Sequence, residues 1–200
     1  METIILASES ERRQDFFRIM GLPFRVIPSQ IDEKIEAGID PRFAAQKIAV
    51  DKTKAVNDIL AEDERTWIAG ADTVILHKQK IYGKPQSRDH AQEMLQNFQG
   101  STHEVITGLA LLNSRKNVCD SCSVTSEVSF AAMTEAEIDW YLDSGEWEGA
   151  AGSYKIQGLA SCFITKISGS YTSIVGLPLY EFYAMLKSNG YPLWDSCMKF

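Results

Sequence analysis

The sequence predicts an α/β or α+β fold built around one elongated mixed sheet. Segments with the apolar spacing of helices alternate with short strand-like runs along the whole chain. Neither an internal repeat nor a linker rich in proline, glycine and serine separates independent domains. With 200 residues, 44% of them hydrophobic, the chain is long enough to bury a core without disulfides or a structural metal. We therefore expect a single domain over residues 1–200.

The first sixty residues predict two strands and two helices. Residues 3–7 and 24–27 are short apolar runs typical of strands, and the segment between them carries aromatic residues at helical spacing. Asp40 is a typical N-cap and Pro41 a typical first helical residue. We expect the helix that they open to run to about Leu60.

The next segment predicts a strand and a hairpin. Residues 67–71 are apolar and lead directly into Asp72, which we place at a strand end or kink. Residues 74–76 and 81–82 flank a polar tip, as the two strands of a hairpin do.

The second half of the chain mixes both kinds of element. Apolar residues at helical spacing up to Phe98 predict a helix with Ser87 as its N-cap. Residues 104–112 and 118–133 are strand-like runs on either side of a turn, and a Thr-x-x-Glu capping box at Thr134 opens a short helix.

The last elements are two more strands and a helix. We expect strands over residues 161–167 and 171–175, and Pro178 opens the final helix.

Charge and hydropathy argue against two classes of protein. Twenty basic and 27 acidic residues give a net charge of −7, which disfavours a broad nucleic-acid-binding face. The longest unbroken apolar run is Phe182–Leu186, far short of the roughly 20 residues that cross a bilayer. The N-terminus lacks the basic charge and long apolar stretch of a signal peptide. We therefore expect a cytoplasmic protein that binds neither nucleic acid nor a membrane.

Cys119 and Cys122 form a C-x-x-C motif. A second ligand pair at zinc-finger spacing is missing from the sequence, and no helix start follows that would lower a thiol pKa. We interpret them as two ordinary cysteines near a hairpin, with a metal or redox role as the alternative.

Three polar segments are candidates for phosphate chemistry. Residues 8–13 place two serines and two arginines where a strand ends and a helix begins, and this junction favours anions. Residues 70–73 present Asp72 after two small residues, where a carboxylate could hold a metal or a water. In residues 83–85, Lys84 could contact a phosphate. The respective alternatives are a solvated first helical turn, a turn-forming aspartate and a plain hairpin exit.

Two further residues have ordinary default interpretations. Glu33 could supply a second carboxylate, although adjacent acids usually form a solvated loop. Lys52 lies on the charged face of the predicted helix, where a lysine usually serves solubility.

Taken together, these segments resemble the Maf family of nucleoside triphosphate pyrophosphatases from Ile4 to about Leu186. The resemblance lies in seven blocks that occur in the family's order. The blocks are Leu6-Ala7-Ser8 to Arg12-Arg13, Asp32-Glu33, Gly70-Ala71-Asp72-Thr73, Gly83-Lys84-Pro85, His103-Glu104-Val105 to Thr107-Gly108, Ile156-Gln157-Gly158 and Val175-Gly176-Leu177-Pro178.

The resemblance implies an elongated, twisted mixed sheet flanked by helices, with two lobes and a central cleft, similar to the inosine triphosphate pyrophosphatases. It implies hydrolysis of nucleoside triphosphates between the α- and β-phosphates with a divalent cation, Mg²⁺ or Mn²⁺. Asp72 would be the proton acceptor, and Glu33 and Asp72 would bind the metal. The residues that would bind the substrate are Ser8, Arg13, Glu33, Lys52 and Lys84.

The resemblance also implies a substrate. Family members that hydrolyse dTTP and UTP carry arginine, threonine and glutamine at the positions of Arg12, Thr73 and Gln157. The 7-methyl-GTP subgroup carries tryptophan, glutamine and glutamate there. We therefore expect a dTTP and UTP pyrophosphatase, and a homodimer is a family expectation. The alternatives are a regulatory interaction protein linked to arrest of septum formation, a nucleic-acid-binding module, and a pyrophosphatase for 7-methyl-GTP or a broader set of modified nucleotides.

The chain departs from the family pattern in three places. Glu11 replaces a usual proline, Thr53 replaces a common alanine, and Gly149-Ala150 replaces a common Asp-Lys pair. The last change removes charges near the expected cleft and bears on substrate affinity more than on the reaction.

Overall fold

The computed structural model describes residues 1–35 and 38–193. The chain divides into two compact units. The first unit comprises Met1–Asp72, Thr107–Val124 and Gly176–Phe200, and the second comprises Thr73–Ile106 and Thr125–Val175. The expectation of one two-lobed domain over residues 1–200 stays a prediction.

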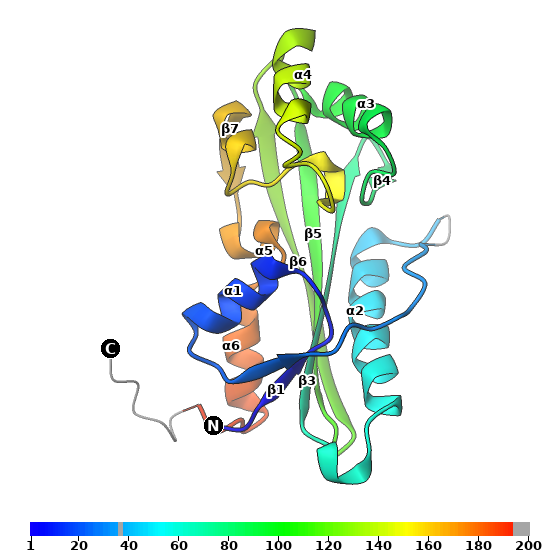
Figure 1. Cartoon of the computed structure of the whole chain (residues 1–200), viewed down its shortest axis with the longest axis vertical. Coiled ribbons are helices and arrows are strands. Elements are labelled where there is room, and N and C mark those ends of the chain that lie inside the picture. The colour runs from blue at the N-terminus through cyan, green and yellow to red at the C-terminus, as the bar shows by residue number, and fades with distance from the viewer. Residues whose placement is uncertain (36–37, 194–200) are drawn as a thin grey trace. The chain divides into compact units, whose positions relative to one another are not determined.

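The described residues form a seven-stranded sheet in the order β2-β1-β3-β5-β6-β7, with β4 paired to β3 (Figure 1). The pairs β1/β2 and β1/β3 are parallel, whereas β3/β4 and β6/β7 are antiparallel. The sheet is therefore mixed, as the sequence predicts. The strands are β1 (Ile4–Leu6), β2 (Phe24–Val26), β3 (Trp67–His77), β4 (Lys80–Tyr82), β5 (Thr102–Asn113), β6 (Val118–Phe130) and β7 (Ile164–Ser168).

Six α-helices accompany the described strands. Two of them begin with the predicted side-chain caps: Asp40 accepts from the Arg42 N–H, and Ser87 accepts from the His90 N–H. The capping box of Thr134 with Glu137 is also present. The helices are α1 (Glu11–Ile19), α2 (Pro41–Asp58), α3 (Arg88–Phe98), α4 (Glu135–Asp143), α5 (Tyr171–Val175) and α6 (Leu179–Ser188).

In the first unit, the chain runs from β1 through α1 to β2, and then through α2 back past β1 to β3. The two crossovers therefore run in opposite directions along the sheet. Because parallel crossovers are right-handed, α1 and α2 are expected on opposite faces. Figure 1 shows the two helices flanking the strands.

Two glycines allow α2 to lie directly on the sheet. A Cβ atom on Gly70 of β3 would overlap the Ala49 carbonyl oxygen, and one on Gly108 of β5 would overlap the Ala45 carbonyl oxygen. The helix backbone therefore lies against these two strands more closely than a side chain would permit.

Aromatic side chains hold each unit together internally. In the first unit, the Phe17 ring lies 5.3 Å from that of Phe24 and 5.2 Å from that of Phe182, so α1 packs against β2 and α6. In the second unit, His103 is buried and its ring centroid lies 4.5 Å from that of Phe98. His103 Nε2 also lies 2.8 Å from the Tyr154 hydroxyl.

The structure confirms most of the predicted elements and corrects three. Residues 171–175 form helix α5 and not a strand. Their β-branched residues favour a strand, but the Ser170 hydroxyl accepts from the Ser173 N–H and its carbonyl from the Ile174 N–H, which starts a helix. The strand expected over residues 161–167 begins only at Ile164, because Leu159–Phe163 form a 3-10 helix, η3.

The third correction concerns Asp72. It lies within β3, which continues without a break to His77, and not at a strand end or kink. Gly70 serves close packing under α2 rather than a turn, because it lies beneath the backbone of that helix.

Two smaller expectations also have an outcome. Cys119 and Cys122 are free thiols on β6, and an odd separation along a strand turns their side chains to opposite faces. Burial raises the pKa of Cys122 to about 11, so this thiol stays protonated.

Within the described residues, the helices are too short or too polar to span a membrane.

Candidate functional site

The site lies where the order of the parallel strands reverses. β1 pairs with β2 on one side and with β3 on the other, and Leu6 is in register with Val26 and Ala69. In sheets of this kind, ligands bind beyond the carboxyl ends of the strands at the point of reversal. Ser8 follows β1, and Asp72 lies three residues beyond Ala69 on β3. Because the pairing of β1 with β3 ends at Leu6 and Ala69, the topology of the first unit brings both residues to the carboxyl end of that pairing, although β3 itself continues past Asp72.

Lys52 is the centre of the polar cluster. Its Nζ lies 2.8 Å from Asp72 Oδ1, 2.8 Å from Glu33 Oε1 and 3.3 Å from the Ala71 carbonyl oxygen. The Lys52 and Asp72 side chains are only 5% and 9% exposed, whereas that of Glu33 is 40% exposed. Lys52 is therefore a buried, ion-paired residue, and its default interpretation as a surface lysine is wrong.

Arg13 forms the second half of the cluster. Its Nε donates to the Gly176 carbonyl at 2.8 Å, and its Nη1 donates to Ser8 Oγ at 2.8 Å. Burial lowers the pKa of the Arg13 guanidinium, while the nearby Asp72 carboxylate acts in the opposite direction. Arg13 is thus a buried side chain held through its Nε and Nη1 atoms, and not part of a solvated helical turn.

Ser8 links the cluster to the start of α1. Its Oγ accepts from Arg13 and, at 3.3 Å, from the Ser10 N–H. The hydroxyl accepts in both bonds, so its own proton is not used by either. A hydroxyl proton and the amides at the start of a helix are the groups that a phosphate oxygen binds.

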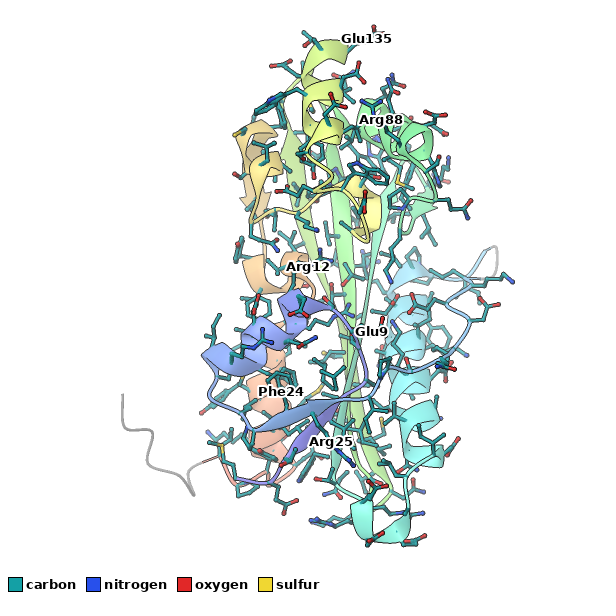
Figure 2. The ribbon with its side chains drawn as sticks, viewed as in Figure 1. Glu9, Arg12, Phe24, Arg25, Arg88 and Glu135 are labelled. Carbon is teal, nitrogen blue, oxygen red and sulfur yellow. The ribbon has the colours of Figure 1, made fainter. Side chains whose placement is uncertain are left out.

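The charges of the cluster nearly cancel. Lys52 and Arg13 face Asp72 and Glu33, so a bound triphosphate would need further positive charge. Arg12 lies on the first turn of α1 with its side chain partly exposed (Figure 2). Its charge contributes, after burial, to the lowered pKa of Arg13.

The carboxylates of Asp72 and Glu33 fit a hard divalent cation. Mg²⁺ is commonly held by one or two carboxylates, with substrate phosphates and water as its other ligands. Among residues 1–35 and 38–193, we find no cluster of three or more histidine, cysteine, aspartate or glutamate side chains suited to a metal. Asp72 and Glu33 thus offer two carboxylates, and both of them contact Lys52.

Three of the predicted site residues belong to the second unit. Thr73 directly follows Asp72 on β3 and is partly buried. Lys84 is exposed just after β4, and Gln157 is exposed in a turn before η3. The structure therefore brings Ser8, Arg13, Glu33, Lys52 and Asp72 together within the first unit, and the grouping of the other three with them stays a prediction.

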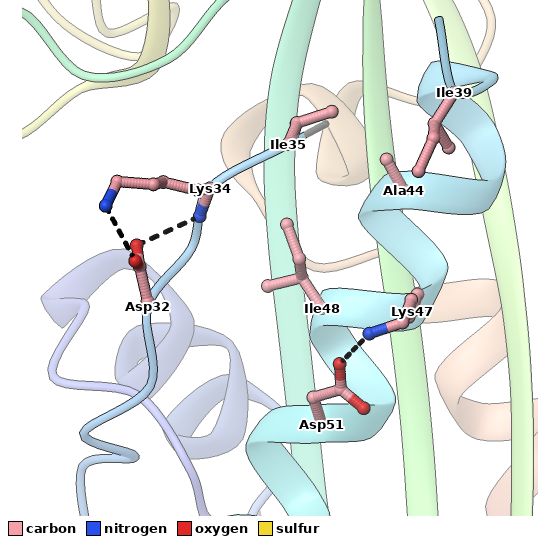
Figure 3. Close-up of a pocket in the computed structure, with 8 residues that line it drawn as sticks. All are labelled: Asp32, Lys34, Ile35, Ile39, Ala44, Lys47, Ile48 and Asp51. Atoms are coloured by element: carbon pink, nitrogen blue, oxygen red, sulfur yellow. Dashed lines mark hydrogen bonds and ion pairs between the residues drawn. The ribbon is translucent and has the colours of Figure 1, made fainter. Parts of the chain in front are cut away.

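A small pocket adjoins the segment that carries Glu33 (Figure 3). Its volume is about 80 Å³. Ion pairs lie at its rim, 3.0 Å between Lys34 and Asp32 and 2.6 Å between Lys47 and Asp51. Its apolar lining is supplied by Ile35, Ile39, Ala44 and Ile48. The pocket therefore lies between the segment next to Glu33 and α2, the helix that carries Lys52.

One participant was not identified from the sequence. The Gly176 carbonyl oxygen accepts from Arg13, and Gly176 has a φ of +125°, a backbone conformation that L side chains rarely adopt. The available signal was a glycine between the apolar Val175 and the Leu177-Pro178 pair that precedes α6.

Comparison with known proteins gives consistent matches over nearly the whole chain. The family model described as "Maf-like protein" matches residues 3–189. A Bacillus cereus protein named dTTP/UTP pyrophosphatase is 41% identical over 94% of this chain and 95% of its own. A Desulforamulus reducens protein of the same name is 40% identical over 95% and 98%. The solved structure of the Staphylococcus aureus Ham1 protein is similar in fold, with a TM-score of 0.51, 12% identity and coverage of 94% of this chain and 100% of its own.

Proposed function

The chain belongs to the Maf family, and from this premise we propose that it hydrolyses dTTP and UTP to the nucleoside monophosphate and pyrophosphate. The main support in the structure is the buried Lys52, which lies 2.8 Å from both Asp72 and Glu33. The pairing of Arg13 with Ser8 beside the same carboxylates supplies the matching phosphate-binding groups.

In the proposed reaction, water attacks the α-phosphorus and the bond to the bridging oxygen breaks. The electron pair of that bond leaves with pyrophosphate, and the Asp72 carboxylate accepts the proton of the attacking water. Lys52 and Arg13 stabilise the negative charge on the phosphate oxygens, and Ser8 donates to one of them. Lys52 also donates to Oδ1 of Asp72, and this bond fixes the carboxylate for the proton transfer.

We further propose that Asp72 and Glu33 hold a divalent cation, Mg²⁺ or Mn²⁺, together with the triphosphate. When bound, the cation polarises phosphoryl oxygens and offsets the charge of the leaving group. Lys84 adds a cation for the phosphates, and Arg12, Thr73 and Gln157 select the pyrimidine base. The names of the two relatives support the choice of a pyrimidine base, because each relative is called a dTTP/UTP pyrophosphatase.

The proposal includes a setting for the enzyme. We propose a cytoplasmic protein that acts on free nucleotides, limits the incorporation of unwanted ones, and forms a homodimer. The net charge of −7 supports a small-molecule substrate over a nucleic acid, because nucleic-acid binding needs a broad basic face.

A turnover assay tests the proposal. Purified protein is incubated with UTP, dTTP or 7-methyl-GTP and with Mg²⁺ or Mn²⁺, and pyrophosphate release is measured. We expect a higher kcat/KM for UTP and dTTP than for 7-methyl-GTP. A preference for 7-methyl-GTP would contradict the choice of substrate, and the absence of turnover on every nucleotide would favour the alternative of a regulatory interaction protein.

A further inference from the structure

A carboxylate of the second unit binds the backbone next to Gln157. Glu146 Oε2 accepts from the Leu159 N–H at 2.8 Å, and its Oε1 accepts from the Ala160 N–H at 3.2 Å. These amides open the 3-10 helix η3, whose N-cap is Gly158. A glycine N-cap has no side chain to accept from them, so Glu146 supplies the cap from 13 residues away along the chain.

The absence of a side chain at Gly158 leaves room for this carboxylate. A Cβ atom at Gly158 would overlap both Oε2 and Cδ of Glu146. The φ of Gly158 is −114°, a negative value that other residues also adopt, so φ alone does not demand glycine. The space that the Glu146 side chain occupies explains why a glycine follows Gln157.

The other side of the carboxylate is held by the protein core. The hydroxyl of Tyr141, a fully buried residue of α4, donates to Glu146 Oε1 at 3.2 Å. On the near side of Gln157, Ile156 is 6% exposed and therefore anchored. Gln157 thus lies between the buried Ile156 and Gly158, which the Glu146 carboxylate contacts closely, and its own side chain is exposed.

We propose that Glu146 is a positioning residue for base selection: it holds the Gln157-Gly158 turn in place so that the Gln157 amide meets the pyrimidine. The inference rests on the proposed function, in which Gln157 contributes to that choice. A glutamine side chain discriminates between bases only when its amide is held in a defined place, because hydrogen bonds weaken steeply with misalignment. A carboxylate is suited to this task because charge-assisted bonds to backbone amides are stronger than neutral ones.

The position of Glu146 predicts which kinetic constant changes. The residue bears on recognition of the base and not on the reacting phosphate, so its loss removes binding that is equal in the ground state and the transition state. Such a loss raises KM and leaves kcat unchanged. The rise in KM should also depend on the substrate. A base that Gln157 does not recognise is bound equally well whether or not the turn is ordered.

The test compares Glu146→Gln, Gly158→Ala and the double variant with the wild-type enzyme. Glutamine keeps the size of Glu146 but has a single acceptor oxygen and no charge, whereas alanine at 158 displaces the carboxylate from the other side. We expect each single change to raise KM for UTP about tenfold, with kcat within about twofold of wild type and KM for 7-methyl-GTP within about twofold. Because both changes break the same contact, the double variant should show about the same tenfold effect and not a hundredfold one.

Glu148→Gln is the matched control. It removes the same charge two residues away, from an exposed side chain, and its kinetics should equal those of wild type. Amide hydrogen exchange provides a second readout, with faster exchange at Leu159 and Ala160 expected in Glu146→Gln and not in Glu148→Gln.

The outcomes separate the two levels of the proposal. An unchanged KM for UTP in Glu146→Gln, or an equal loss on UTP and 7-methyl-GTP, would overturn the positioning role while the wild-type enzyme remains a UTP pyrophosphatase. Additive effects in the double variant would overturn it as well. Wild-type protein without turnover would overturn the proposed function, and this inference with it, before any variant is compared.

Discussion

Replacing Asp72 with asparagine tests the centre of the site. Asparagine keeps the size of the side chain and an oxygen that can accept from Lys52, but it cannot take up a proton or carry a negative charge. The change therefore separates the chemistry of the carboxylate from its packing.

The expected loss of activity follows from the proposed role. A positioned general base contributes about 10²- to 10⁴-fold to a rate, and a displaced cation would add to the loss. We expect pyrophosphate release to fall at least about a hundredfold. Binding of UTP should largely survive, because Arg13 and Lys52 stay in place and a negative charge near the phosphates is removed.

The structure also gives an expected cost in stability. Lys52 is 5% exposed, and the substitution removes one of its two carboxylate partners at 2.8 Å. Removing a partner of a buried charge outright costs about 3 to 5 kcal/mol. Because the amide oxygen and Glu33 still accept from Lys52, we expect a cost no greater than the lower end of that range. For a chain of this length, 3 kcal/mol lowers Tm by about 6 to 12 °C.

The assay measures pyrophosphate release, calorimetric UTP binding and a circular dichroism melt on the same preparation. Asp51→Asn is the matched control, because Asp51 is also ion-paired with a lysine on α2 but is 35% exposed. A surface pair of this kind contributes about 0 to 1 kcal/mol, so the control should melt and turn over like wild type. Asp72→Asn protein that retains more than about a tenth of wild-type activity would refute the role of Asp72 as the proton acceptor.

Three further predictions concern other parts of the chain. Lys84→Ala should lower kcat/KM for UTP at least about tenfold with little change in Tm, because it removes an exposed cation, and unchanged kinetics would return Lys84 to a plain hairpin exit. Gly108→Ala should lower the free energy of unfolding in urea by about 1 to 3 kcal/mol, since its Cβ would overlap the Ala45 carbonyl oxygen, and a wild-type value would contradict that close approach. Burial lowers the pKa of His103 from 6.5 to about 3. As the pH falls, His103 is therefore protonated in the unfolded chain at a higher pH than in the folded chain. The stability that neutral His103 contributes is complete above pH 6.5 and is lost as the pH falls toward 3. The free energy of unfolding should therefore decline less steeply with falling pH in His103→Phe than in wild type, and parallel curves would contradict this reasoning.

Local signals in the sequence predicted most of the elements. The N-caps Asp40 and Ser87 and the capping box at Thr134 act within one helical turn, so their effect can be read from a few residues. Residues 171–175 were predicted wrongly for the same reason. Their β-branched composition favours a strand, but Ser170 begins a helix that a composition argument does not detect.

The prediction of the site residues depended on the family resemblance more than on local sequence patterns. From spacing alone Lys52 was a surface residue, because its burial follows from α2 lying against β3, which is a tertiary event. Glu146 carried no signal at all, since its partners are backbone amides 13 and 14 residues away. Side chains that act through distant backbone leave little trace in a single sequence.

The closeness of α2 to the sheet has a consequence for how this enzyme tolerates change over evolution. Gly70 and Gly108 set the height of the helix above β3 and β5, and Lys52 extends from that helix to Asp72. The two glycines thus determine the distance between α2 and the sheet, which the Lys52 side chain must span to contact Asp72. A descendant could retain Ser8, Arg13, Glu33, Lys52 and Asp72 unchanged and still lose the arrangement if a methyl group at either glycine lifted the helix. A change at two residues that have no side chain could therefore disturb the ion pair between Lys52 and Asp72.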